Sequence, residues 1–260
     1  MSVRLRWLRR RRRFDGTLEG LVNFRDLGGL RAAGGVVRPG VLFRSDSLAY
    51  ATPGDAERLV GELGVATVID LRGEYEVEQL GRGPLHEAAV DYYAAPIADV
   101  SGAEDLVGHY LAMLEERGEV LAGTVRLLGR PGALPAVFHC EAGCDRTGVL
   151  AAVVLSLLGV PDAVIAADYA ATAAAMPTIH ERVAVVVDRL GLPPRPPSVL
   201  VWEPEAAMMA RTLELVRQRW GGMHGWARAF GITPAELAAL RSRLVTRRRP
   251  APASPGSGGR

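Results

Sequence analysis

PAVFHCEAGCDRTGVLAAVVLSLLG, residues 135–159, combines an apolar strand, a seven-residue turn from Cys140 to Arg146 and a buried helix. A turn at a helix N-terminus directs several backbone N–H groups at one point. Together with the helix dipole, these groups make a site for a doubly charged phosphate. A glycine inside the turn lets the backbone curl tightly. We therefore expect phosphate to be bound by Glu141, Ala142, Gly143, Cys144 and Thr147.

The side chains at the two ends of this turn suit phosphoryl chemistry. Cys140 lies at its base, where the same field favours the nucleophilic thiolate. Arg146 offers two parallel N–H donors to phosphoryl oxygens, which a lysine could not match, and Thr147 can donate a hydrogen bond to the sulfur. A cysteine that serves only packing is the alternative for an isolated Cys-x5-Arg. The strand, His139 and the Arg-Thr-Gly exit occur together here, which favours catalysis.

Composition is typical of a globular enzyme: 260 residues, 48% hydrophobic and 23% charged, enough for one large domain or two small ones. The longest apolar run, within Val149–Val160, is shorter than the roughly 20 residues of a membrane-spanning helix. Two cysteines cannot make a disulfide framework, and their spacing with His139 is not a usual zinc pattern. We expect no metal and no cofactor.

Charge is distributed unevenly along the chain. Residues 1–13 hold seven arginines and residues 247–260 hold four, with no acid at either end. The body between them is therefore acidic, and nucleic acid is not expected as a partner. We predict a basic arm over residues 1–14, which could contact anionic membranes weakly, a catalytic domain over 15–246 and a disordered tail over 247–260. Acidic residues follow the arginines where a secretory signal would be apolar, so a cytoplasmic location is expected, with non-classical secretion left open.

Short apolar runs alternate with helical patterns, which predicts an α/β fold with a central, mostly parallel four-stranded sheet and helices on both sides. The predicted strands are Val41–Phe43, Ala66–Leu71, Ala89–Ala94 and Ala136–His139. Helix starts are predicted at Thr52-Pro53 and Thr233-Pro234. From Pro161 onward the pattern is helical, with segments at Asp162–Thr172, Thr178–Leu190, Pro204–Trp220 and Pro234–Val245 and a proline-rich break at Pro193–Pro197.

Further motifs lie outside the turn: Asn23-Phe24-Arg25-Asp26-Leu27-Gly28-Gly29, Arg38-Pro39-Gly40, Phe43-Arg44-Ser45-Asp46, Ile69-Asp70-Leu71-Arg72 and Asp168-Tyr169. With the turn, they resemble the bacterial tyrosine-phosphatase-like family, whose loop reads His-Cys-x-x-Gly-Lys-Asp-Arg-Thr-Gly and which includes mycobacterial secreted phosphatases. The resemblance covers about residues 20–245. It implies a cysteine-phosphatase fold, a phosphocysteine intermediate, no metal, and activity on phosphotyrosine, sometimes extended to phosphoserine, phosphothreonine or phosphoinositides.

Residue by residue, Cys140 matches the family's nucleophile, Arg146 its phosphate-binding arginine and Asp145 its loop aspartate. Cys144 stands where the family has lysine. That lysine is associated with polyphosphorylated substrates, so its absence argues against phosphoinositides. We also consider a redox role, in which Cys144 traps an oxidised Cys140 as a reversible disulfide.

Expulsion of the leaving group requires a proton donor, and a carboxyl group then assists water. Asp145 is our first candidate, ahead of Asp70 and then Asp46. Arg25, Asp26, Arg44 and Arg72 follow turns or strand ends, where they could contact substrate or form structural ion pairs. We expect His139 to shape the loop as a hydrogen-bonded core histidine.

The Ala-rich stretch Ala163–Leu190 could form a two-helix lid, as in some relatives, but ordinary core helices are preferred. The favoured activity is hydrolysis of phosphomonoesters, with phosphotyrosine proteins as substrates. Three further functions stay open: a phosphoinositide phosphatase, a phospho-binding pseudophosphatase that lacks turnover, and a thiol redox enzyme resembling an arsenate reductase.

Overall fold

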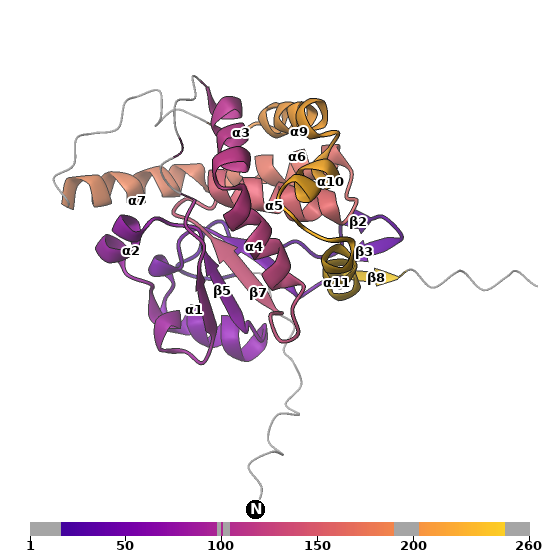
Figure 1. Ribbon diagram of the computed structural model, residues 1–260. Helices are drawn as coiled ribbons and strands as arrows, with labels where there is room; N and C mark the ends of the chain where they lie inside the picture. Colours follow the sequence, from indigo (N-terminus) through magenta and orange to yellow (C-terminus); the bar gives the residue numbers. More distant parts are fainter. Residues whose placement is uncertain (1–16, 98–99, 101–104, 190–202, 248–260) are drawn as a thin grey trace, which may run out of the picture.

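The computed structural model describes residues 17–97, 100, 105–189 and 203–247 (Figure 1). The basic arm, the tail beyond Arg247 and the proline-rich break lie outside these residues. Among the helices within them, none is both long and apolar enough to cross a membrane.

A five-stranded sheet forms the centre, with the strand order β1-β4-β7-β5-β6. The strands are β1 (Arg25–Asp26), β4 (Leu42–Ser45), β5 (Thr67–Asp70), β6 (Asp91–Ala94) and β7 (Ala136–His139). β4, β7, β5 and β6 are parallel, which confirms the predicted α/β fold and its four strands. The expected count of four is corrected by β1, a two-residue strand antiparallel to β4 at the edge. It is too short for a period-two pattern to reveal it.

The register of the parallel strands aligns their carboxyl ends. Ser45 pairs with His139, His139 with Asp70, and Asp70 with Ala94. Ligand sites of parallel sheets lie beyond this edge. The segments that follow β4, β5 and β7 therefore leave the sheet side by side, although they are far apart in sequence.

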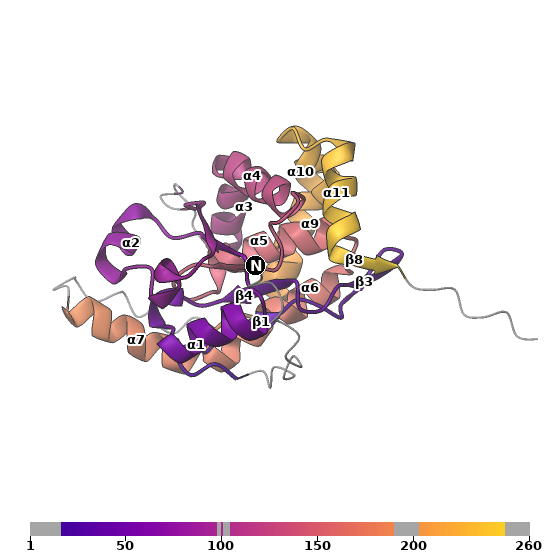
Figure 2. The ribbon, with the colours of Figure 1, turned by 90° about the horizontal axis from the view of Figure 1, so that it is seen from below.

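Alternation along the strands divides the interior into two cores. Leu42, Ile69 and Phe138 belong to the larger core, while Phe43 and Val137 belong to the smaller one on the opposite face. Successive strand residues point to opposite faces, so an uninterrupted apolar strand must be covered on both. Figure 2 shows α3 (Leu106–Glu116) and α4 (Gly118–Leu128) on one side of the sheet and α1 (Pro53–Glu57) on the other.

Helices make up most of the rest of the described residues. Their bounds are α1 (Pro53–Glu57), α2 (Glu74–Leu80), α3 (Leu106–Glu116), α4 (Gly118–Leu128), α5 (Asp145–Leu157), α6 (Asp162–Ala170), α7 (Met176–Arg189), α9 (Ala206–Trp220), α10 (Met223–Ala229) and α11 (Pro234–Leu244). Short helical turns lie at Leu48–Tyr50, Arg58–Glu62, Pro84–Glu87 and Ala171–Ala175. The two predicted helix starts are confirmed, because Thr52 and Thr233 both close capping boxes.

A second, three-stranded antiparallel sheet lies at the far side of the molecule (Figure 1). It consists of β2 (Arg31–Ala32), β3 (Gly35–Val37) and β8 (Val245–Arg247). No sequence pattern predicts this sheet, and β8 also corrects the expected start of the tail at Arg247. Its strands pair segments from opposite ends of the chain, which local patterns cannot connect.

The Ala-rich stretch proves to be of two kinds. α6 packs in the larger core through Ile165, Ala166 and Tyr169. α7 buries only Met176 and Ile179 and extends outward beyond the sheet (Figure 1). The expectation of ordinary core helices is therefore correct for α6 and wrong for α7, which buries only two of its 14 residues.

Candidate active site

The loop after β7 is shorter than expected, because α5 begins at Asp145 and Arg146 lies in its first turn. The outward-facing carbonyl groups of this loop all accept hydrogen bonds from neighbouring segments. The Ser47 N–H donates to Glu141 O (2.9 Å), the Asn23 Nδ2 amide donates to the carbonyls of Ala142 (3.0 Å) and Gly143 (3.1 Å), and Arg44 Nη2 donates to Gly143 O (2.7 Å).

These bonds also orient the amides of the loop. In a trans peptide, the N–H group points opposite to the carbonyl of the preceding residue. With the carbonyls of residues 141, 142 and 143 held outward, the N–H groups of Ala142, Gly143 and Cys144 point to the inner side of the loop. This arrangement, at the N-terminus of α5, can bind an anion.

Gly143 is required at its position for two reasons. Its φ of +68° lies in the left-handed region. A Cβ atom there would also lie 2.4 Å from the carbonyl oxygen of Ser45. The close approach of the loop to the end of β4 therefore needs a residue without a side chain.

The candidate nucleophile and the candidate phosphate-binding arginine are both held in this loop. Cys140 is 2% exposed at the end of β7. Arg146 donates two hydrogen bonds to Glu76 of α2, Nη1 to Oε2 at 2.5 Å and Nη2 to Oε1 at 2.8 Å. Burial lowers the pKa of Arg146, but the charges of Cys140 and Glu76 outweigh it and raise the pKa. The guanidinium is therefore oriented and always charged.

Two arginines from separate strands share one carboxylate behind the loop. Arg25 Nε contacts Asp168 Oδ1 at 2.8 Å, and Arg44 Nη1 contacts Asp168 Oδ2 at 2.6 Å. Arg25 also donates to Asn23 Oδ1, which leaves the Asn23 amide free to bind the loop. Burial raises the pKa of Asp168, but the two arginines lower it by more than burial raises it, so the carboxylate stays ionised. Arg25 and Arg44 thus act as structural ion pairs of the loop.

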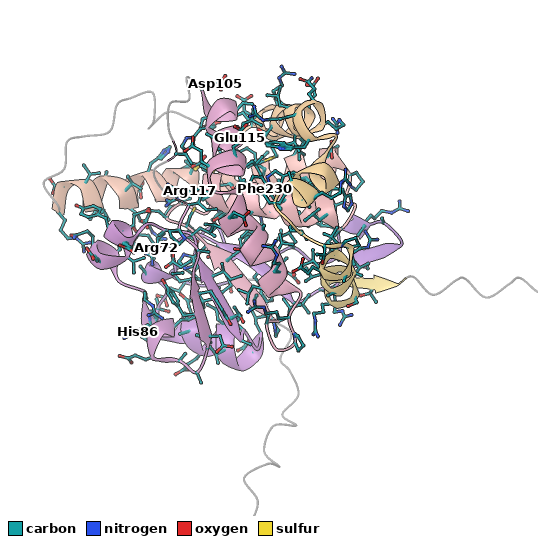
Figure 3. All side chains as sticks on the ribbon, in the orientation of Figure 1. Arg72, His86, Asp105, Glu115, Arg117 and Phe230 are labelled. Atoms are coloured by element: carbon teal, nitrogen blue, oxygen red, sulfur yellow. The ribbon has the colours of Figure 1, made fainter. Side chains whose placement is uncertain are left out.

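A second cluster lies beneath the loop at the end of β5. Arg72 binds Asp70 (Nη2 to Oδ2, 2.7 Å) and Ser47, and it donates to the carbonyl of Gly81 just past α2. Figure 3 labels Arg72 beside α2. His139 Nε2 lies 3.6 Å from Asp70 Oδ2. Burial raises the pKa of Asp70, but His139 and Arg72 lower it overall. A carboxyl group held ionised in this way is a poor proton donor.

His139 is fully buried and keeps the role expected of a core histidine. Burial lowers its pKa to about 4, with Asp70 opposing and Arg72 assisting the shift. The ring Nδ1 lies 3.1 Å from the carbonyl oxygen of Cys140. The imidazole is therefore neutral at physiological pH, and it orients the nucleophile's backbone.

Asp46, the third acid candidate, anchors the segment before β1 and the helix α7. It accepts hydrogen bonds from the backbone of Asn23 (3.0 Å) and Val22 (3.3 Å), and Arg182 contacts it at 3.1 Å. Burial raises its pKa, against the two N–H groups that lower it. Arg182 lies over the Tyr50 ring, 4.9 Å from its centroid. α7 thus reaches the loop region from the side.

Glu141 contributes a carboxyl group as well as its backbone. Its Oε1 accepts a hydrogen bond from the Tyr50 hydroxyl at 2.6 Å, while the buried Oε2 has no partner among the described residues. Burial raises the pKa of Glu141. Beside it, Ala142 packs against Met176 and Ile179 of α7.

Two expectations about loop side chains need correction. Thr147 Oγ1 is buried and makes no hydrogen bond within the described part of the chain, so the bond to the sulfur of Cys140 is not formed. Cys144 is fully buried and turned toward Tyr169, away from the loop rim where a lysine would act. Both cysteines are free. Within the described residues, Asp26 makes no hydrogen bond to the loop; its carboxylate accepts hydrogen bonds from the backbone N–H groups of Gly28 and Gly40.

Asp145, the first acid candidate, is partly exposed at the first position of α5. Its Oδ1 accepts a hydrogen bond of 2.6 Å from Tyr110 of α3. No group of three or more His, Cys, Asp and Glu side chains in the described ranges is arranged to hold a metal ion.

Sequence reasoning missed several residues that support the loop. Asn23 and Asp168 lie in recognisable motifs, yet their patterns assign neither residue to the site. Glu76 and Tyr110 give no local signal, because their partners Arg146 and Asp145 lie 70 and 35 residues away in sequence.

Comparisons with known proteins find several phosphatases that are similar to this chain. A tyrosine-protein phosphatase of Cupriavidus necator, provisionally so named, is 32% identical over 246 residues, 86% of this chain and 87% of that protein. The triple specificity protein phosphatase PtpB of Mycobacterium tuberculosis is 27% identical over 276 residues, 88% of this chain and 98% of PtpB. The core catalytic domain of the PP-IP phosphatase Siw14 of S. cerevisiae aligns with a TM-score of 0.40 and 15% identity, covering 60% of this chain and 78% of that one.

A family model matches almost the whole described part of the chain. It is the model of the tyrosine phosphatase family, and it spans residues 16–246. This span includes the loop after β7, the motif that holds its carbonyl groups and the helices that carry Glu76 and Asp168. The chain therefore belongs to the tyrosine phosphatase family and is a cysteine-dependent phosphatase.

Proposed function

We propose that this phosphatase hydrolyses phosphotyrosine in proteins through a phosphocysteine on Cys140, with Arg146 binding the phosphoryl oxygens and Asp145 as the general acid. The observation that carries the proposal is the outward tethering of three successive loop carbonyls. It leaves inward N–H groups at a helix N-terminus next to a cysteine and an oriented guanidinium.

The reaction would proceed in two displacements. The Cys140 thiolate attacks phosphorus, the P–O bond to the tyrosyl oxygen breaks, and that oxygen takes a proton from Asp145. A water molecule then attacks the thiophosphate, the S–P bond breaks, and the proton of the water returns to Asp145. The loop amides and Arg146 stabilise the negative charge that the equatorial oxygens carry in both transition states.

Charge pairing around the loop supports a substrate with a single phosphate. Five arginines lie nearby, and each has a carboxylate partner: Arg25 and Arg44 share Asp168, Arg72 binds Asp70, Arg146 binds Glu76, and Arg182 binds Asp46. The family's lysine is replaced by the buried Cys144. A polyphosphorylated inositol lipid would find little unpaired positive charge for its further phosphates, so we place phosphotyrosine ahead of phosphoinositides.

Thiol redox chemistry and phosphate binding without turnover have less support. A redox pair would need Cys144 to exchange protons and reach solvent, but its side chain is fully buried and burial raises its pKa well above the usual value. A binding-only pseudophosphatase would not need the nucleophile, the arginine and the loop aspartate that this chain keeps.

The proposal is tested with intact protein and three substrates: a phosphotyrosine peptide, a phosphoserine peptide and a phosphoinositide in mixed micelles. We expect the highest kcat/KM for the phosphotyrosine peptide, and Cys140→Ser to lower kcat by roughly 10⁴-fold or more. Acid quenching during turnover, followed by intact mass spectrometry, should show one added phosphoryl group on Cys140. Turnover that survives in Cys140→Ser would overturn the mechanism, and a preference for the phosphoinositide would overturn the substrate assignment.

Location and further partners are proposals as well. A cytoplasmic location agrees with the sequence, and weak contact of the basic arm with anionic membranes agrees with its charge. Vesicle sedimentation with and without anionic lipid, comparing the full chain with a chain lacking residues 1–14, would test the second point.

A further inference from the structure

A series of buried, hydrogen-bonded side chains runs from the candidate acid into the core. The Tyr110 hydroxyl lies 2.6 Å from Asp145 Oδ1 and 2.6 Å from the Tyr169 hydroxyl. The Tyr169 hydroxyl is hydrogen-bonded in turn to the Cys144 thiol. Tyr110, Tyr169 and Cys144 are each at most 1% exposed, so water does not compete for these bonds.

The directions of the two hydrogen bonds of Tyr110 follow from its having a single hydroxyl proton. Tyr110 donates its single hydroxyl proton to Asp145 Oδ1. The Tyr110 oxygen therefore accepts its second hydrogen bond from the Tyr169 hydroxyl. The Tyr169 and Tyr110 hydroxyls are thus both polarised toward Asp145, and each of these hydrogen bonds strengthens the other.

We propose that Tyr110 is a positioning residue that holds Asp145 by Oδ1, so that Oδ2 carries the proton given to the leaving group. The inference rests on the proposed role of Asp145 as the acid. Oδ2 has no hydrogen-bond partner among the described residues, and the side chain lies at the partly exposed start of α5. Fixing one oxygen removes rotation about the side-chain bonds, which favours proton transfer in a single geometry.

The same buried cluster of Tyr110, Tyr169 and Cys144 gives a physical reason for cysteine at position 144. Burial and the charge of Asp145 raise the pKa of Cys144 well above its usual value, so the group stays an uncharged thiol beside Tyr169. A lysine side chain could not occupy this buried position beside Tyr169 without burying its charge. Gly148 allows the arrangement, because a Cβ atom at that position would lie 2.8 Å from the Tyr169 ring.

The test compares two aryl phosphates that differ in their need for an acid. p-Nitrophenolate leaves without a proton, whereas phenolate, like tyrosine with a pKa of about 10, needs one. The readout is the ratio of kcat/KM for p-nitrophenyl phosphate to that for phenyl phosphate. Both values come from one preparation, so the fraction of folded enzyme cancels from the ratio.

We expect Tyr110→Phe to raise this ratio about tenfold, because only the phenyl ester loses the aid of a well-placed acid. The matched control is Tyr92→Phe, which also removes a hydroxyl donated to a buried carboxylate, at Asp70. Its ratio should equal that of the wild type. Tyr169→Phe, which leaves the bond from Tyr110 to Asp145 in place, should raise the ratio less than Tyr110→Phe does.

Asp145→Asn separates the inference from the function on which it rests. If Asp145→Asn raises the ratio and Tyr110→Phe does not, Asp145 is the acid and the positioning role is wrong. If neither raises it, the acid assignment itself fails. A larger ratio in Tyr92→Phe than in Tyr110→Phe would move the acid to Asp70. An equal loss on both esters in Tyr110→Phe would show a merely structural contact.

Discussion

Single atoms decide the shape of the loop at the residue scale. Gly143 has a left-handed backbone and lies against the end of β4. Asn23 binds two loop carbonyls with one amide group. Asn23 does not need to touch the substrate and Gly143 offers it only a backbone N–H, yet together they turn the loop amides inward.

Gly143→Ala should therefore impair both catalysis and stability. We expect a loss of unfolding free energy of about 2–4 kcal/mol, from the strained φ and from the contact of the new Cβ with Ser45 O, and a fall in kcat/KM of at least about tenfold. Denaturant unfolding and steady-state kinetics measure the two effects. Gly132→Ala is the matched control, because its φ is +84° and nothing lies within 4 Å of the added Cβ. Equal effects of both substitutions would mean that the close approach to β4 is unimportant.

At the scale of elements, helices supply groups that the loop cannot provide itself. α2 presents Glu76 to Arg146, and α7 packs Met176 and Ile179 against Ala142. β7 and α5 carry the loop, and their positions alone do not orient the guanidinium. The orientation of Arg146 therefore depends on how α2 docks at the end of the sheet.

Glu76→Gln tests this dependence. The variant keeps the shape of the side chain but loses the paired bonds to Arg146, so we expect kcat/KM to fall about tenfold. Glu78→Gln, an exposed site on the same helix, controls for the loss of one charge near the substrate. Inhibition by inorganic phosphate should weaken in Glu76→Gln alone. Unchanged phosphate affinity in Glu76→Gln would indicate that Arg146 is oriented without α2.

At the scale of the whole molecule, the functional edge of the sheet is held by buried charges between two apolar cores. These charges link stability to pH, and His139 gives the clearest case. Its pKa falls from about 6.5 in the unfolded chain to about 4 in the folded protein. Between these values the unfolded state binds the extra proton, so stability rises with pH and is lost as the pH falls from about 6.5 to about 4.

His139→Gln should remove this part of the pH dependence. From pH 7 to pH 4, the wild type should lose up to about 3 kcal/mol more unfolding free energy than the variant, whatever the variant's stability at pH 7. Urea unfolding at several pH values measures the difference. The exposed His86 provides the control variant His86→Gln. Parallel curves for wild type and His139→Gln would show that the buried histidine is protonated in the folded state.

The local sequence was sufficient for the four parallel strands, for the two capped helix starts and for the strand, loop and helix at the centre of the site. Strand β7, the Cys140 loop and helix α5 follow one another within 25 residues, so their patterns and their chemistry can be read together. The capping boxes at Thr52 and Thr233 are equally local, because each is completed within four residues. The motifs at Asn23 and Asp168 were visible, but nothing in the sequence indicated which loop atoms they bind.

The tertiary structure alone decided the partners of each functional group. Glu76, Tyr110 and Tyr169 meet the loop only because the register of the sheet and the packing of α2, α3 and α6 bring them there. The direction of Cys144 into the core was equally invisible in the sequence. Periodicity reports which face of an element is apolar, whereas a hydrogen bond depends on positions within a fraction of an ångström. Those positions are set by contacts between segments that are distant in the chain.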